Sequence, residues 1–184
     1  MTSIPMKNKL ILCFLLFVNA CDAQPKQDQA TAPKTECEFS FKELNTCNFK
    51  TSTYEVKATI ESEIVAEDEK IIKKIITELN DVEQILPVSP DTSLLDGDIG
   101  YISFADINFD KVPDLAITTS FGTPNLYLDY WVYDTKQKKY ISVGNYPKFT
   151  INEQKKILSA KIKSDAATYQ NIEWHWNNNA LQKN

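Results

Sequence analysis

The stretch Leu126-Tyr-Leu-Asp-Tyr-Trp-Val-Tyr133, continued by Asp134-Thr-Lys-Gln-Lys138 and Tyr140-Ile-Ser-Val143, decides the fold class. Aromatic and β-branched residues fill the two outer segments, and a polar cluster separates them, which is typical of a β-hairpin. The same alternation of apolar runs and polar turns fills the chain from Phe39 onward. We therefore expect an all-β protein, an antiparallel meander with a propeller-like or curved sheet.

Nine segments carry this strand pattern. They are residues 37–41, 54–65, 101–104, 115–119, 126–133, 140–143, 148–151, 157–163 and 169–176. Residues 68–86 are ambiguous, because their apolar positions also fit helical spacing and Asp68 could cap a helix. Since strands and turns flank this segment, we expect a strand through residues 71–77, with one short helix as the alternative.

The composition excludes several classes of function. The chain has 184 residues, with four glycines, one histidine, 20 Lys and no arginine, and 25 acidic residues give a formal net charge of -5. Neither G-x-G-x-x-G nor G-x-x-x-x-G-K occurs, which argues against a nucleotide partner. An acidic chain without guanidinium groups argues against nucleic acid. Because the single histidine, His175, has no nucleophile motif beside it, we expect a protein that is not an enzyme.

An export signal occupies the start of the chain. Lys7 and Lys9 precede the apolar run 10–18, and Ala20 stands before Cys21, so residues 1–20 are predicted to be a signal peptide. Val18-Asn-Ala-Cys21 resembles a lipobox, in which the cysteine is lipidated and becomes the new N-terminus. Plain cleavage and an uncleaved anchor are the alternatives. The apolar run is shorter than the roughly 20 residues that span a membrane.

Processing at Cys21 changes the charge of the exported protein. Removal of Lys7 and Lys9 leaves 18 Lys against 25 acidic residues, a net charge of -7. Residues 22–35 contain no large apolar side chain, so segment 21–35 is predicted to be a lipidated tether that cannot fold alone. Residues 36–184 are predicted to form a single all-β domain. The expected location is the periplasm, with a lipid anchor in the inner or outer membrane.

Two cysteines remain in the predicted domain, Cys37 and Cys47. In an oxidising compartment such a pair most simply forms a disulfide. Metal ligation and a reactive thiol are the alternatives, although two cysteines and one distant histidine do not make a zinc site.

One segment carries a pattern of metal ligands, Asp106-Ile-Asn-Phe-Asp-Lys-Val-Pro-Asp114. Oxygen-bearing side chains stand at positions 1, 3, 5 and 9 (Asp106, Asn108, Asp110 and Asp114), and Val112 at position 7 can offer its backbone carbonyl. Calcium prefers six to eight hard oxygen ligands, which such a loop supplies. The predicted cofactor is therefore Ca²⁺. The alternative is a metal-free polar turn in which Asp106 and Asn108 cap backbone amides.

The spacing also indicates the type of loop. Position 12 is Ile117, so the bidentate Glu of an EF-hand is missing. The segment instead resembles the calcium loop of FG-GAP repeats, D-x-[DN]-x-D-G-x-x-D-L, and every acidic position matches. Lys111 replaces the glycine that allows positive φ in that loop, at a cost of roughly 1 kcal/mol.

The resemblance extends beyond the loop, over about residues 54–181. It includes Ile102 to Asp110 and Pro113 to Ile117 around the loop, Tyr130-Trp-Val-Tyr133, Tyr140-Ile-Ser-Val143, Ile157-Leu-Ser-Ala160, Tyr169 and Trp174-His-Trp176. Together these residues resemble bacterial periplasmic lipoproteins that act as immunity proteins against a lysozyme-like peptidoglycan hydrolase of a type IV secretion system. The resemblance implies a calcium-binding protein with a propeller-like all-β fold that inhibits a cell-wall hydrolase.

Two other functions stay open. One is an envelope module, structural or adhesive, that binds a protein or glycan through the aromatic segment 127–133 without inhibiting anything. The other is a hydrolase that uses calcium and a carboxylate pair, although no two of the 25 acidic residues stand out as that pair. For the inhibitor, an acidic chain predicts a basic partner, because opposite net charges accelerate association.

Overall fold

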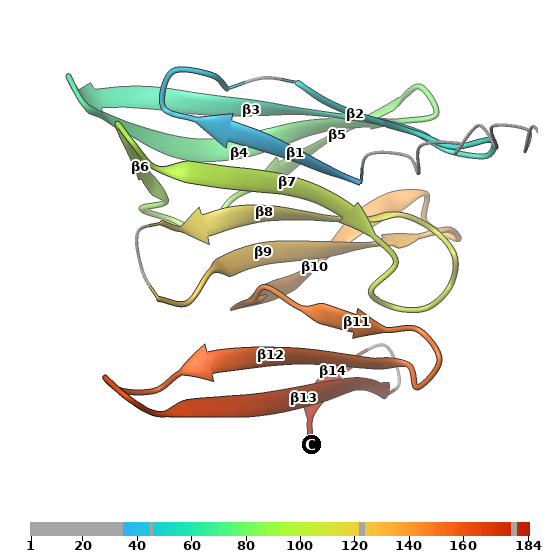
Figure 1. Ribbon diagram of the computed structural model, residues 1–184. Coiled ribbons are helices and arrows are strands. Elements are labelled where there is room, and N and C mark those ends of the chain that lie inside the picture. Colours follow the sequence, from blue (N-terminus) through green and yellow to red (C-terminus); the bar gives the residue numbers. More distant parts are fainter. Residues whose placement is uncertain (1–34, 45, 122–123, 178–179) are drawn as a thin grey trace, which may run out of the picture. The chain divides into compact units, whose positions relative to one another are not determined.

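The strands of the computed structural model form three antiparallel sheets (Figure 1). The structure describes residues 35–44, 46–121, 124–177 and 180–184, all of which belong to the unit that spans residues 32–184. The predicted signal peptide, Cys21 and the tether up to residue 34 lie outside the described residues. Within those ranges there are fourteen strands and no helix, which confirms the all-β prediction. None of the described ranges forms a helix long and apolar enough to cross a membrane.

Each sheet contains four consecutive strands in a meander, the unit from which propeller blades are built. The first sheet has β2 (Cys47–Lys50), β3 (Glu55–Ala66), β4 (Glu69–Leu79) and β5 (Val82–Pro87), and β6 (Ser93–Leu95) pairs with β4. The middle sheet has the order β1 (Glu36–Ser40), β7 (Ile99–Ala105), β8 (Asp114–Ser120), β9 (Tyr127–Asp134) and β10 (Lys139–Pro147). The third sheet has β11 (Thr150–Asn152), β12 (Ile157–Lys163), β13 (Tyr169–Asn177) and β14 (Ala180–Lys183).

The middle sheet is covered on both faces, as Figure 1 shows by its place between the other two sheets. Leu115 and Ile117 of β8 belong to the hydrophobic core shared with the first sheet, whereas Ala116 belongs to the core shared with the third sheet. On β9, Trp131 faces the first core and Tyr130 the second. Successive side chains of a strand point to opposite faces, so a strand between two cores must be apolar at nearly every position.

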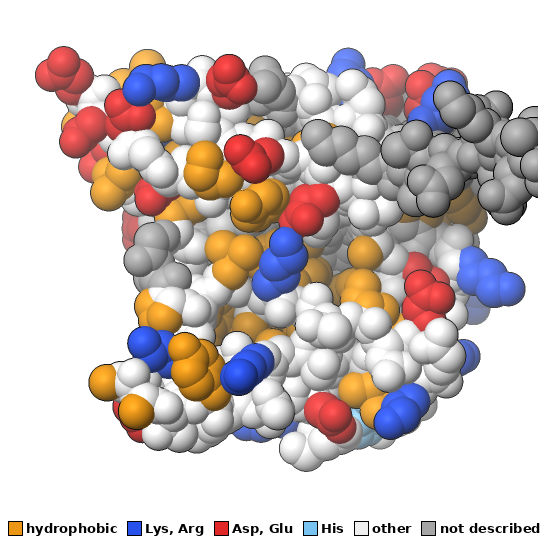
Figure 2. All heavy atoms as spheres, viewed as in Figure 1, with side chains coloured by type: hydrophobic (Ala, Val, Ile, Leu, Met, Phe, Trp, Pro, Cys, Tyr) orange, Lys and Arg blue, Asp and Glu red, His pale blue; other side chains and the backbone are white. Residues whose placement is uncertain are grey.

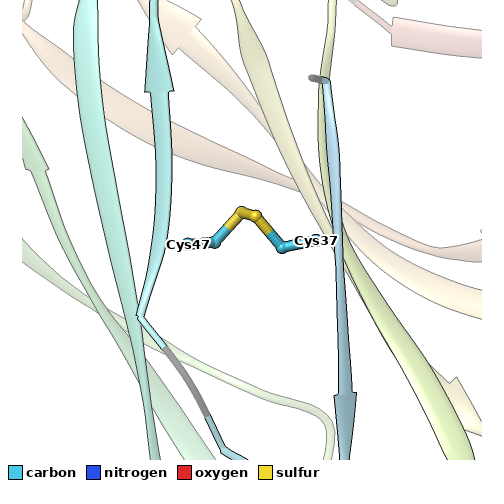
Figure 3. Close-up of a disulfide and its surroundings, with 2 residues drawn as sticks. All are labelled: Cys37 and Cys47. Atoms are coloured by element: carbon cyan, nitrogen blue, oxygen red, sulfur yellow. A yellow bond between two sulfur atoms is a disulfide. The ribbon is translucent and has the colours of Figure 1, made fainter.

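A disulfide joins Cys37 on β1 to Cys47 on β2, with a Cα–Cα distance of 5.7 Å, which confirms the predicted pair (Figure 3). Because β1 belongs to the middle sheet and β2 to the first sheet, the bond ties two sheets together. Closing a loop of this length stabilises a fold by about 3 kcal/mol, through its effect on the unfolded chain.

The ambiguous segment 68–86 is strand throughout its apolar part. β4 and β5 fill it, so the prediction of a strand at 71–77 is confirmed and the short helix is wrong. The register between β3 and β4 shifts at Lys73, where Ser62 pairs with Ile72 and Glu61 with Lys74. This β-bulge puts Ile72 and Ile75 on the same face, and their three-residue spacing is what imitated a helix.

Other differences concern short strands. The sequence did not predict β2, β5, β6 or β14, and of the strand that it placed at 148–151 only residues 150 and 151 are strand, at the start of β11. β5 and β14 are exposed over most of their length, and a strand without a buried face carries little alternation of polar and apolar residues. β2 and β6 do bury side chains, but at four and three residues they are too short for a periodic pattern to stand out.

Candidate metal-binding loop

The predicted calcium segment forms the connection between β7 and β8. β7 ends at Ala105 and β8 begins at Asp114, and these two residues are paired across the strands. Ile107 and Val112 are buried and hold the two arms of the loop in the protein interior. The indole N–H of Trp176 donates to the Ile107 carbonyl at 2.6 Å, and the Tyr140 hydroxyl donates to the Pro113 carbonyl at 3.3 Å. These two hydrogen bonds hold the loop from both sides, because Tyr140 belongs to the core shared with the first sheet and Trp176 packs against the core shared with the third sheet.

The side chains of Asp106, Asn108 and Asp110 close the exposed part of the loop. The two carboxylate oxygens of Asp106 accept the Asp110 N–H at 3.0 Å and the Lys111 N–H at 2.7 Å. Asn108 Oδ1 also accepts the Asp110 N–H, and Asp110 Oδ1 accepts the Val112 N–H at 2.8 Å. Asn108 Nδ2 donates to Asp110 Oδ2 at 3.0 Å. These are amide-capping bonds of the kind expected for a polar turn.

Two residues of the loop adopt positive φ, Phe109 at 64° and Lys111 at 70°. Lys111 stands where the FG-GAP pattern has glycine, so the backbone takes the left-handed conformation there although the residue has a side chain. An L-residue in this region is strained by roughly 1 to 2 kcal/mol. The capping bonds from Asp106 to the amides of Asp110 and Lys111 hold the strained turn in place.

Asp114 differs from the other predicted ligands because it points inward and only 1% of its surface is exposed. Its Oδ1 accepts the N–H of Tyr133 on β9 at 2.9 Å. Its Oδ2 accepts the N–H groups of Ile107 at 2.9 Å and Asn108 at 3.3 Å. The pKa of Asp114 is raised to about 8, mainly by burial; the N–H bonds from Tyr133 and Ile107 act to lower it, and the nearby Asp110 and Asp106 add to the rise. The side chain joins the loop to the neighbouring strand.

The donor set suits calcium in its chemistry. All the side-chain donors are hard oxygens, and each ionised carboxylate has about four lone-pair sites, so the bonds at Asp106 and Asp110 leave acceptor capacity over. The arrangement itself is not a preformed cluster. Among the described residues, no group of three or more Asp, Glu, His or Cys side chains is placed to hold a metal ion.

The structure also brings together polar residues that the sequence did not single out. Asp129 on β9 is buried and accepts the Ser89 N–H at 2.6 Å, the Ser89 hydroxyl at 2.7 Å and Asn145 Nδ2 at 2.8 Å. These bonds connect the middle sheet to the segment that follows β5. The sequence signal for this cluster was Asp129 itself, a charged residue inside an apolar strand, because a buried carboxylate needs hydrogen-bond partners.

The aromatic segment 127–133 lies in the interior for the most part. Tyr130 and Trp131 are buried in the two cores, and Trp174 of β13 is buried as well. His175, on the opposite face of β13, is hydrogen-bonded to the side chain of Asn184. The largest side chains of β9 therefore stabilise the fold and do not offer an exposed surface for stacking on a sugar.

Lipidation at Cys21 cannot be placed, since this residue lies outside the described ranges. Comparison of the chain with protein-family models, with curated proteins and with solved structures finds no match.

Proposed function

We propose that the protein is a periplasmic lipoprotein that binds and inhibits a peptidoglycan-degrading, lysozyme-like enzyme. The observation that carries the proposal is the loop between β7 and β8. It has the acidic spacing of the immunity-protein family, and Lys111 adopts the positive φ that the family's glycine would adopt. The positive φ of Lys111 agrees with this resemblance, but the acidic spacing carries the argument, since Lys138 and Lys156 also adopt positive φ in hairpin turns of this protein.

Calcium binding is part of the same proposal. Asp106, Asn108, Asp110, the carbonyl of Val112 and Asp114 would hold the ion. When bound, Ca²⁺ would supply positive charge to a loop that contains three carboxylates, and would thereby stiffen the connection between β7 and β8. The chain's own residues anchor this connection through Ile107, which lies in the core shared with the third sheet.

The proposed action is binding without catalysis. The exported chain has a net charge of -7, which favours encounter with a basic hydrolase. Its only histidine, His175, is bonded to an amide side chain rather than to a nucleophile. The envelope-module alternative assigns binding to the aromatic strand, and burial of Tyr130 and Trp131 removes most of the surface it would need.

The test is an inhibition assay with the full-length lipoprotein in detergent. A panel of basic lysozyme-type hydrolases, including any encoded by a neighbouring gene, digests peptidoglycan while turbidity is followed. We expect one enzyme to be inhibited at near-stoichiometric ratio, and an unrelated acidic lipoprotein to have no effect. If every enzyme retains full activity in calcium and in chelator, the inhibitor proposal is wrong and the envelope module becomes the better explanation.

A further inference from the structure

We infer that the basic partner docks on one end of the first sheet, formed by two turns that we call the β3–β4 tip (residues 63–69 and 95–99). This inference rests on the proposed function for the identity of the partner, but its surface is defined by the structure alone. Four large hydrophobic side chains are exposed there, Ile64 and Val65 on β3, Leu95 at the end of β6 and Ile99 at the start of β7. Ile64 is 69% exposed and Val65 50% exposed.

The two turns are joined into one unit by hydrogen bonds. The Asp96 N–H donates to the Asp68 carbonyl at 2.9 Å, and the Ser93 hydroxyl donates to Glu69 Oε1 at 2.5 Å. Asp98 closes its own turn by accepting the Leu95 N–H at 2.9 Å. Since β6 also pairs with the first residues of β4, the tip is held in place before any partner arrives.

One edge of β3 is unpaired at this end of the first sheet. β2 pairs with β3 only over residues 55–58, so the edge of β3 from Thr59 to Ala66 has no neighbour within the described sheets. Soluble proteins usually protect such edges with polar and charged residues. Here Ile64 and Val65 interrupt the polar residues, and apolar side chains on an otherwise protected edge indicate a contact surface.

The charges of the tip specify the kind of partner. Its two segments contain six acidic residues and no basic one. Glu63 pairs with Lys73 at 3.2 Å and Asp96 pairs with Lys42 at 3.0 Å. The remaining four (Glu67, Asp68, Glu69 and Asp98) form no ion pair with a described residue. Figure 2 shows acidic and hydrophobic side chains together at the upper left, where Figure 1 places the β3–β4 turn and β6.

An apolar centre with an acidic surround fits a basic protein that exposes a complementary apolar patch. Burial of the apolar side chains would supply affinity, and the acidic residues would supply the rate of encounter and the choice of partner. A purely anionic surface would bind cations of any kind, so the exposed Ile64 and Val65 are the feature that favours a basic protein with an apolar patch of its own.

The experiment measures binding separately from inhibition, with the same panel of basic lysozyme-type hydrolases as the probe. The tip variant is Ile64→Ser with Val65→Ser in the full-length protein. The matched control is Val82→Ser with Ile85→Ser, because those residues are similarly exposed, at 48% and 54%, but lie on β5. We expect the tip variant to raise Kd at least about tenfold and the control to leave it within about twofold. Unchanged melting temperatures would show that both variants are folded.

Charge reversal provides an independent measurement. Glu67→Lys with Asp68→Lys should slow association by about tenfold at low ionic strength, and the difference should shrink near 0.5 M salt, where charges are screened beyond about 4 Å.

The outcomes distinguish failure of the docking surface from failure of the inhibitor function. If the wild-type protein and the tip variant bind a hydrolase equally well, the docking surface is wrong even where inhibition is confirmed. If binding depends on the tip but no enzyme is inhibited, the docking surface stands and the inhibitor function is wrong. If the wild-type protein binds no member of the panel, both are overturned.

Discussion

Asp114→Ala is the change that most directly tests the structure of the β7–β8 loop. The substitution removes the acceptor of three backbone N–H groups, those of Ile107, Asn108 and Tyr133. The N–H of Ile107 is the donor most affected, because this residue is only 2% exposed. Each buried donor that loses its partner costs about 1 to 3 kcal/mol.

The expected loss is about 3 to 4 kcal/mol of unfolding free energy. Three unpaired donors would suggest more, but a cavity of about 160 Å³ borders Asp114, and water entering it can satisfy part of the loss. At roughly 3 °C for each kcal/mol in a domain of this size, the melting temperature should fall by about 10 °C.

The assay is thermal and urea unfolding of the full-length protein in the presence of a chelator, so that no metal contributes. Asp110→Ala is the matched control, because Asp110 belongs to the same loop but is exposed and accepts only one backbone N–H, that of Val112, against three for Asp114. We expect the control to lose less than about 1 kcal/mol. Equal losses in the two variants, or an Asp114→Ala variant as stable as the wild type, would refute the inward role of Asp114.

Five further predictions concern the loop, the disulfide, Asp165 and the lipid anchor. Calcium should raise the melting temperature of the wild-type protein. Lys111→Gly should add about 0.5 to 1 kcal/mol of stability, because glycine adopts positive φ without strain, and it should tighten calcium binding. A less stable Lys111→Gly variant would contradict the strain at this position. Replacing Cys37 and Cys47 by serine should cost about 3 kcal/mol, measured by urea unfolding, and reductant should then have no further effect. N–H bonds from Ala167 and Thr168 hold the pKa of Asp165 below its usual value. The ionised carboxylate therefore stabilises the fold above the unfolded pKa, and this stabilisation is lost as pH falls through the folded pKa. The difference in unfolding free energy between the wild type and Asp165→Ala should narrow in acid, and a difference that stays constant with pH would contradict the lowered pKa. Cys21→Ser should move the protein from the membrane fraction to the soluble fraction, detected by immunoblotting; retention in the membrane would rule out a lipid anchor at Cys21.

The sequence predicted the fold best where a strand is buried. Residues 126–133 and 157–163 match β9 and β12 within one residue, because an alternating or continuous apolar pattern is imposed by the cores on either side. β14 buries little, and β6 has only three residues, one of them buried, so a periodic pattern does not distinguish either strand from a loop. Residues 68–86 looked partly helical because a bulge at Lys73 changed the spacing of buried isoleucines, and a bulge is visible only when the partner strand is known.

The candidate site was predictable in its residues but not in their directions. The spacing of Asp106, Asp110 and Asp114 shows that three carboxylates lie on one loop, and from spacing alone they are equivalent. In the structure the three carboxylates have different roles, because Asp114 accepts the N–H of Tyr133 on β9. This partner is nineteen residues away in the sequence, so the contact can be predicted only when the order of the strands in the sheet is known. The calcium proposal therefore depends most on Asp106, Asn108 and Asp110, which are partly or fully exposed and whose oxygens keep lone pairs, whereas the buried Asp114 should stabilise the loop whether or not an ion binds. A calcium-dependent stabilisation that disappears in Asp110→Ala but survives at reduced overall stability in Asp114→Ala would demonstrate this division.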